Sequence, residues 1–153
     1  MISYPDTSFL CALYRRQDNS LLALDYRRSM SGPLIVTRLL LWEFRQSARF
    51  QAFRHSKNPA VGYPINEAEK MISDLSDDLQ GELVISTDVD FISLLVTGER
   101  ISKGRTFRGG HRSFDLLHVA TALELGAKDF LSFDANQIHL ASAEGLETPL
   151  AEA

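Results

Sequence analysis

Short runs of apolar residues alternate along the chain with longer stretches in which apolar residues recur every three or four positions. The short runs are strand-like because they are brief and bounded by turn residues. They span residues 1–4, 34–37, 83–86 and 129–134. The longer stretches have the period of an amphipathic helix and span residues 8–16, 20–28, 38–55, 67–80, 88–102, 113–125 and 135–144. Strands that alternate with helices predict an α/β fold with a mainly parallel sheet.

Polar residues that favour helix starts mark where several of these helices begin. Thr7 or Ser8 is the expected cap of the first helix, and Asn66 and Thr87 are the expected caps of the fourth and fifth. Gly126 follows the sixth helix and is expected to end it, since glycine readily adopts the left-handed conformation found there.

Length and composition are those of one globular domain. A chain of 153 residues buries a sizeable core, and 44% apolar with 24% charged residues is ordinary usage. No apolar run approaches the length of a membrane span, because Arg38 interrupts the best one, residues 34–42. The first residues lack the pattern of a signal peptide. Cys11 is the only cysteine, which excludes an internal disulfide and predicts a protein of the reducing cytoplasm.

Charge is unevenly distributed, although the net charge is only −4. Residues 1–57 carry +5 and residues 99–112 carry +4, whereas residues 58–98 carry −7 and residues 113–153 carry −6. The second basic segment contains the glycine-rich stretch "KGRTFRGGHR", which we expect to be a loop. Twelve of the sixteen basic residues are arginine, whose planar guanidinium suits phosphate. The pattern is typical of a basic rim around an acidic centre; a solvated surface with chance clustering is the alternative.

Four carboxylates stand at positions that favour chemistry. Asp6 follows the first strand and Asp134 ends the last one, and in a parallel sheet both can face the crevice at the carboxyl ends of the strands. Asp115 lies in the first turn of a helix, where the dipole favours its ionised form. Glu43 stands alone within the apolar stretch "LLLWEF". Clustered carboxylates need a cation between them, and ligands that are all oxygen favour Mg²⁺ or Mn²⁺.

Each of these acids also has an ordinary structural role available. Asp6 and Asp134 stand where aspartates commonly cap helices or form turns. Asp115 can satisfy a helix start, and Glu43 can pair with an arginine or reach solvent. The order of the four acids along the chain and the places where they stand, taken together, favour a metal site over four separate structural roles.

Three stretches carry a resemblance to a known family: "YPDTSFL", "VTRLLLWEF" and "SFDLLHVATALELGAKDFLSFD". Together they resemble PIN domains, and within that group the VapC toxins of bacterial toxin–antitoxin pairs. The last stretch is the most specific, with Asp–x–x–His, then Ala–x–Ala–Leu, then a strand ending in Asp. The resemblance covers about residues 2–147. It predicts one PIN-like domain, residues 1–147, followed by a C-terminal tail, residues 148–153.

The resemblance implies a PIN-like three-layer α/β/α sandwich with a central, mainly parallel sheet. It further implies a Mg²⁺- or Mn²⁺-dependent endoribonuclease that leaves a 5′-phosphate and a 3′-hydroxyl, a homodimer, and a neutralising antitoxin protein as partner. The metal-binding and catalytic acids would be Asp6, Glu43, Asp115 and Asp134.

The fourth acid departs from the family pattern. Many relatives have Asn where Asp134 stands and an acid three residues later, where this chain has Gln137. One or two metal ions are therefore both compatible with the sequence. Ser8 matches a hydroxyl residue near the first acid, and Ser132 stands where many relatives have threonine, so both are supporting residues.

Basic side chains near these acids are candidates for contacts with the RNA backbone, without sequence readout of their own. They are Arg45, Arg49, Arg105, Arg108 and Arg112. His118, one turn after Asp115, could act as a general base, but a structural histidine is the favoured interpretation because metal activation of water requires none.

Two alternatives from other classes remain open. A PIN fold without catalysis could serve as an RNA-binding or regulatory module, and the same metal site could act on DNA. Other strand-end aspartate chemistries fit less well. A haloacid-dehalogenase-type phosphatase needs an acid where Ser8 stands, a receiver domain needs paired acids after the first strand, and a nicotinamide enzyme needs a glycine-rich fingerprint there.

Overall fold

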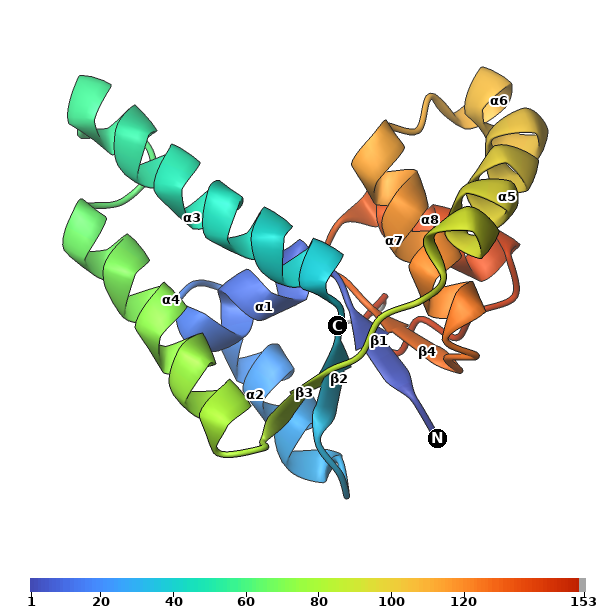
Figure 1. Ribbon diagram of the computed structural model, residues 1–153. Coiled ribbons are helices and arrows are strands. Elements are labelled where there is room, and N and C mark those ends of the chain that lie inside the picture. The colour runs from blue at the N-terminus through green and yellow to red at the C-terminus, as the bar shows by residue number, and fades with distance from the viewer. Residues whose placement is uncertain (152–153) are drawn as a thin grey trace.

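A computed structural model describes residues 1–151. Four short strands run parallel through its centre (Figure 1). β1 (Ser3–Pro5) pairs with β4 (Asp129–Leu131), and β2 (Leu34–Val36) pairs with β3 (Val84–Ser86). β1 packs beside β2, although the described residues form no hydrogen-bonded ladder between them, so the two parallel pairs lie in the order β3-β2-β1-β4. The predicted parallel sheet is confirmed.

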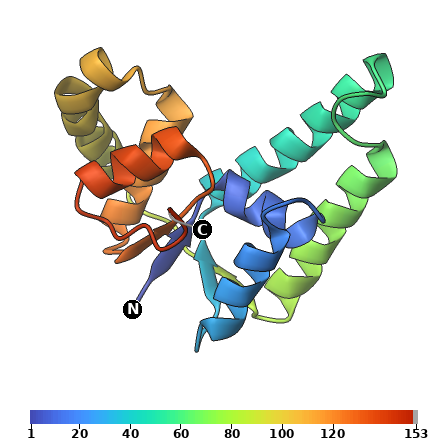
Figure 2. The same cartoon turned by 180° about the vertical axis from the view of Figure 1, so that it is seen from behind.

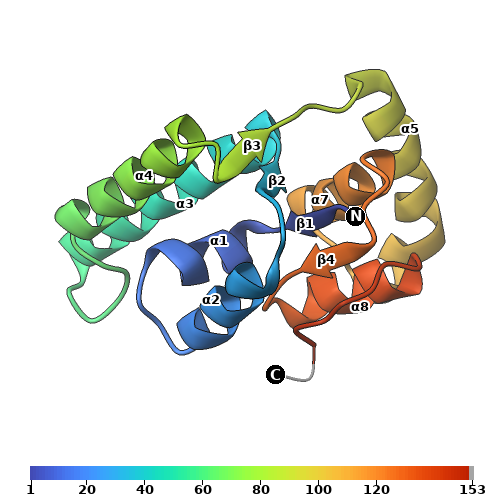
Figure 3. The ribbon, with the colours of Figure 1, turned by 90° about the horizontal axis from the view of Figure 1, so that it is seen from below.

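Helices connect these strands and cover the sheet on both sides. Figures 1 and 3 show one group made of α1 to α4 and a second made of α5 to α8, with the strands between them. This arrangement confirms the three-layer α/β/α sandwich. The helices are α1 (Thr7–Tyr14), α2 (Ser20–Ser29), α3 (Arg38–Lys57), α4 (Ile65–Gln80), α5 (Phe91–Ile101), the π-helix η1 (Ser102–Thr106), α6 (Phe107–Gly109), α7 (Ser113–Glu124) and α8 (Ala135–Ala143).

The core lies between the sheet and the two helical groups. Its largest fully buried side chains include Tyr4 of β1, Phe9 of α1, Phe44 of α3 and Phe130 of β4. All three residues of β1 and all three of β4 are buried, as expected for parallel strands covered on both faces. This burial fixes the carboxyl ends of β1 and β4 next to each other.

Helices α3 and α4 form a hairpin whose far end projects away from the sheet (Figures 1 and 2). Its turn approaches α3 closely at Gly62, which has a φ of +63°. A Cβ atom there would lie 2.1 Å from the backbone oxygen of Gln51, so only glycine fits this turn. Among residues 1–151, no helix combines the length and the apolar composition that crossing a bilayer requires.

Several predicted boundaries need correction. The cap of α1 is Asp6, not Thr7 or Ser8, because the Asp6 side chain accepts the hydrogen bond of the Phe9 N–H. Helix α4 begins after Pro64, whose fixed φ suits a helix start, and Asn66 lies inside it. Gly126 does end α7 with a φ of +65°, as predicted.

The start of α5, residues 103–112 and the residues after α8 also differ from the predictions. Asp90, not Thr87, caps α5 by accepting from the Ser93 N–H. The predicted loop 103–112 is mostly helical, because η1 and α6 continue α5 without a break and only 110–112 are irregular. After α8 the chain returns along β4 at Glu147, and Leu150 of the predicted tail is buried. Residues 152–153 lie outside the described residues.

Candidate active site

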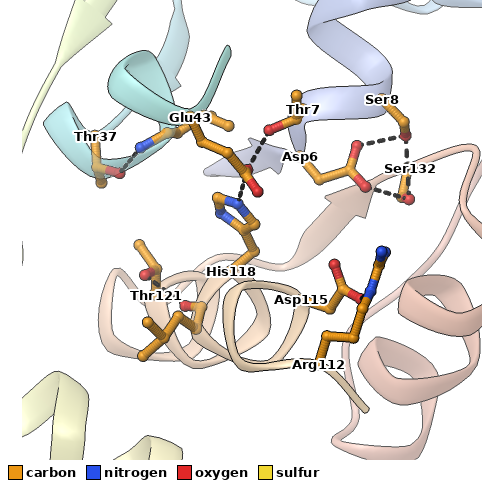
Figure 4. Close-up of polar contacts among 12 residues, drawn as sticks. Asp6, Thr7, Ser8, Thr37, Glu43, Arg112, Asp115, His118, Thr121 and Ser132 are labelled. Carbon is orange, nitrogen blue, oxygen red and sulfur yellow. Dashed lines mark hydrogen bonds and ion pairs between the residues drawn. The ribbon is translucent and has the colours of Figure 1, made fainter. Parts of the chain in front are cut away.

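Asp6 is the most buried carboxylate of the site and has no exposed surface. It follows β1 directly, and as the cap of α1 it accepts a 3.0 Å hydrogen bond from the Phe9 N–H on Oδ1. Hydroxyls bind the rest of the carboxylate: Ser8 donates to Oδ1 at 2.6 Å, and Ser132 donates to Oδ2 at 2.5 Å (Figure 4). Burial raises the pKa of Asp6, although the hydrogen bonds from Ser132, Ser8 and Phe9 oppose that rise.

The two serines connect the ends of β1 and β4. Ser8 Oγ also accepts from the Phe133 N–H at 2.9 Å, and Ser132 Oγ accepts from the Asp134 N–H at 2.9 Å. Each hydroxyl thus donates to Asp6 and accepts from the backbone that follows β4. This arrangement makes both serines positioning residues for the Asp6 carboxylate.

Glu43 projects from the second turn of α3 toward α7. Its Oε2 accepts hydrogen bonds from Thr7 Oγ1 and from His118 Nε2 (Figure 4). Partial burial by itself would raise the pKa of Glu43, but the hydrogen bond and charge of His118, together with Thr7, lower it. A charge in the apolar stretch of α3 is therefore compensated by specific partners.

His118 has no exposed surface, and its role is set by the residues around it. Nε2 faces the Glu43 carboxylate and therefore carries a proton, while Nδ1 lies 3.4 Å from the Tyr4 hydroxyl. An imidazole held between Tyr4 and Glu43 is a positioning group, which agrees with the structural interpretation. The sequence placed His118 one turn after Asp115 but gave no sign of its partner on α3.

Asp115 lies in the first turn of α7 and is nearly buried, with 8% of its surface exposed. Its Oδ2 accepts a 2.9 Å hydrogen bond from Nε of Arg112, the residue that precedes α7 (Figure 4). The hydrogen bond and charge of Asp115 raise the pKa of Arg112, and Asp134 and Glu43 contribute further. The Arg112 guanidinium therefore stands in the field of three of the four acids.

Asp134 caps α8 at the carboxyl end of β4. Its Oδ1 accepts from the N–H groups of Asn136 and Gln137, at 2.9 and 3.0 Å. No hydrogen bond to Oδ2 forms among residues 1–151, and the side chain is half-buried at the rim of the site. The ordinary capping role therefore operates at Asp134, and one of its oxygens is still available.

Three of the four acids surround one region but are not gathered at one point. Figure 4 shows Asp6, Glu43 and Asp115 around the space between β1, α3 and α7. Within residues 1–151, however, no three His, Cys, Asp or Glu side chains are grouped closely enough to hold a metal ion. Each acid is instead bound to hydroxyls, to backbone N–H groups or to a basic side chain. The oxygen-only donor set fits a hard divalent cation in its chemistry.

Of the five predicted arginines, two bind a carboxylate of the described residues and three do not. Arg112 contacts the acidic centre, and Arg105 binds Glu144 at the end of α8. Arg108 forms no ion pair within the described part of the chain, and Arg45 and Arg49 lie along α3, with Arg49 at the groove beside α4. The residues that sequence reasoning missed are Thr7 and Tyr4, whose polar contacts depend on partners far away in the chain.

The fold and the site define a class: a single α/β/α unit with carboxylates around one region where parallel strands end. Comparison with known proteins narrows this class. The model of the PIN domain family matches residues 3–143. The chain belongs to the PIN domain family.

A solved structure supports this fold. The crystal structure of VapC20 of Mycobacterium tuberculosis, described as a sarcin–ricin loop cleaving toxin, matches with a TM-score of 0.61. The match covers 94% of this chain and 95% of that chain, at 16% sequence identity. A search of curated proteins found no match.

Proposed function

We propose that this protein is a metal-dependent endoribonuclease and the toxin of a toxin–antitoxin pair. The observation that carries the proposal is the convergence of Asp6, Glu43 and Asp115 on one region of a PIN fold. Three elements distant in sequence each present a carboxylate there, at the end of the sheet where parallel α/β folds bind ligands. The fold is similar to that of VapC20, a sarcin–ricin loop cleaving toxin, and on this basis we propose RNA as the substrate.

Asp6, Glu43 and Asp115 would hold Mg²⁺ or Mn²⁺, with Asp134 at the rim. When bound, such an ion lowers the pKa of a coordinated water and stabilises charge that develops on the phosphate. Binding requires the carboxylates to turn from their present partners, since Asp115 is now bound to Arg112 and Glu43 to His118.

The protein's own side chains determine how this site is prepared. Ser8 and Ser132 hold Asp6 in a fixed orientation, and the Nε2–H of His118 orients Glu43. Burial around Asp6 excludes water from one side of the site. Arg112 neutralises Asp115, and its guanidinium would bind a phosphate of the RNA backbone. In-line hydrolysis would leave a 5′-phosphate and a 3′-hydroxyl.

Two surfaces provide for the proposed protein partners. An apolar groove of about 930 Å³ lies between α3 and α4, lined by Ala52, Phe53 and Ala68 among others, with Arg49 and Glu69 as its charged residues. We assign this groove to an apolar segment of the antitoxin, because the lining offers mainly apolar contact and charges of both signs. A second copy of the chain would cover the exposed stripe of Ile92, Leu95 and Val96 on α5, forming the homodimer.

The decisive test is an RNA cleavage assay with Mn²⁺, with EDTA and with the variant Asp6→Asn. We expect cleavage by the wild type with metal, none with EDTA, and a loss of more than about 100-fold in Asp6→Asn, because even outer-shell partners of a metal site cost 10- to 100-fold. Asparagine still caps α1, so the variant should stay folded. Asp90→Asn is the matched control, since Asp90 also caps a helix, α5, and among the described residues its side chain accepts from the Ser93 N–H and from none of the four acids' partners.

The alternative functions give different results in the same assay. RNA binding without metal-dependent cleavage by the wild type would identify a binding or regulatory module. Cleavage of single-stranded DNA but not RNA would identify a DNA nuclease. Full activity in Asp6→Asn, with contaminating nuclease removed, would contradict the site assignment. The antitoxin is tested separately: a small open reading frame next to the gene, co-expressed, should abolish cleavage and bind the purified protein.

A further inference from the structure

A small cavity lies between the η1–α6 segment and α8, beside the candidate active site. Its volume is about 190 Å³, which corresponds to roughly six water molecules. The polar residues around it are Arg105, Arg108, His111 and His139, and the glycines Gly104 and Gly109 form part of its wall. No acidic side chain lines it.

The charges around this cavity are only partly compensated. Glu144 follows the lining residue Ala143, but its two carboxylate oxygens bind Arg105 at 2.9 Å and Arg100 at 2.8 Å. Within residues 1–151, the side chains of Arg108, His111 and His139 form neither an ion pair nor a hydrogen bond. Arg108 and His139 are exposed and His111 is half-buried, so three side chains that can donate hydrogen bonds line the cavity with no protein partner in the described part of the chain.

Gly109 makes this arrangement possible. A Cβ atom at position 109 would lie 2.3 Å from His111 Nε2, far inside contact distance. The imidazole of His111 therefore lies against the backbone at Gly109, and a side chain at position 109 would require the ring to move. Five of the residues that line the cavity come from the segment "KGRTFRGGHR".

The cavity and the acidic centre are lined by neighbouring residues of the chain. His111 lines the cavity, and the next residue, Arg112, binds Asp115. Arginine and histidine donors around a small cavity suit a tetrahedral oxyanion.

We propose that this cavity binds a backbone phosphate of the RNA, at a nucleotide neighbouring the one that is cleaved. The proposal rests on the proposed function for its ligand. Arg108 supplies the charge, His111 and His139 supply hydrogen bonds, and Gly109 keeps His111 in place. The subsite would position the strand and add affinity for single-stranded RNA without reading bases.

Binding of single-stranded RNA, measured by fluorescence anisotropy in EDTA on the Asp6→Asn background, tests the subsite without needing cleavage. We expect Arg108→Gln to weaken binding about fivefold and to reduce the salt slope of log K by about 0.7, the loss of one phosphate contact. His139→Gln should weaken binding with a smaller change in slope. Gly109→Ala, which keeps every charge, should also weaken binding because it displaces His111.

Arg28→Gln is the matched control, because Arg28 is an exposed arginine on α2 whose removal changes the net charge equally. Equal affinity and salt slope in Arg108→Gln and Arg28→Gln would overturn the proposal. A second measurement follows the ring resonances of His111 and His139 by NMR, with His55 as reference. Shifts on adding RNA support the subsite, and shifts with inorganic phosphate but not with RNA refute it. Absence of cleavage by the wild type would refute the proposed function while leaving these binding results interpretable.

Discussion

Two aspartates follow the carboxyl ends of β1 and β4, and both cap a helix, but their surroundings differ. Asp6 and Asp134 each follow a strand and cap the next helix. Asp6 is fully buried, with hydroxyl donors on both oxygens. Asp134 is half-buried and uses one oxygen for the two N–H groups of α8. Helix capping and a place in a polar site are therefore compatible, and burial distinguishes the two positions.

The largest expected difference between these aspartates is in catalysis. Asp6→Asn should reduce RNA cleavage by more than about 100-fold, whereas Asp134→Asn should reduce it by about tenfold, as for an outer partner of a metal site. Asparagine preserves both caps, so the circular dichroism spectra should match the wild type. Equal losses of kcat/KM in the two variants would show that the difference in burial has no functional meaning.

Ser132→Ala separates the buried carboxylate from the strand that supports it. The variant removes the donor to Asp6 Oδ2 and the acceptor of the Asp134 N–H. We expect about a 10- to 100-fold loss in kcat and about 1–3 kcal/mol less free energy of unfolding, since a buried acceptor is left without its partner. Urea denaturation measures the second effect. Ser132→Thr keeps the hydroxyl and should restore most of both.

The helix cap at Asp134 should contribute less to the free energy of unfolding than the hydrogen bonds of Ser132 do. Asp134→Ala removes both hydrogen bonds to the start of α8 and should cost about 1 kcal/mol of unfolding free energy. Asp134→Asn should cost far less, because its side-chain oxygen remains. If alanine and asparagine at this position unfold at the same urea concentration, capping contributes nothing to stability there.

Glu144 extends the comparison to a carboxylate held by arginines. Partial burial would raise the pKa of Glu144, but the hydrogen bonds and charges of Arg100 and Arg105 outweigh it and lower the pKa. The pKa of Glu144 is lower in the folded state than in the unfolded state. The stabilisation is therefore fully present when the pH is above the unfolded-state pKa, and it is lost as the pH falls through the folded-state pKa. Glu144→Gln should therefore cost about 0.5 kcal/mol at pH 7.

The pH dependence provides the check on Glu144. The difference in unfolding free energy between Glu144→Gln and the wild type should shrink steadily as the pH falls below about 4.3, the ordinary value for glutamate. Thermal unfolding of both proteins at several pH values measures it. A difference that stays constant down to pH 2.5 would mean that the ion pairs do not stabilise the fold.

The fold could largely be read from the sequence because each strand and helix has a local signal. The apolar run before Asp6 and the glycine at position 126 are examples whose predictions held. The continuation of α5 through η1 was missed, since glycines at 104 and 109 suggested a loop while helical hydrogen bonding persisted through them. The contacts of Glu43 with His118 join residues 75 positions apart, and no local pattern encodes them. The metal-site role of the four acids stays a prediction.

The pairing of β1 with β4 also has a consequence for the order of folding. Ser3 lies opposite Asp129, so a strand near the start of the chain acquires its neighbour only after most of the chain exists. Asp6 and Ser132 are separated by 126 positions and meet only then. Contacts so distant in sequence form late. A growing chain on a ribosome therefore lacks the hydrogen bond that holds Asp6 Oδ2 until β4 and Ser132 have been synthesised.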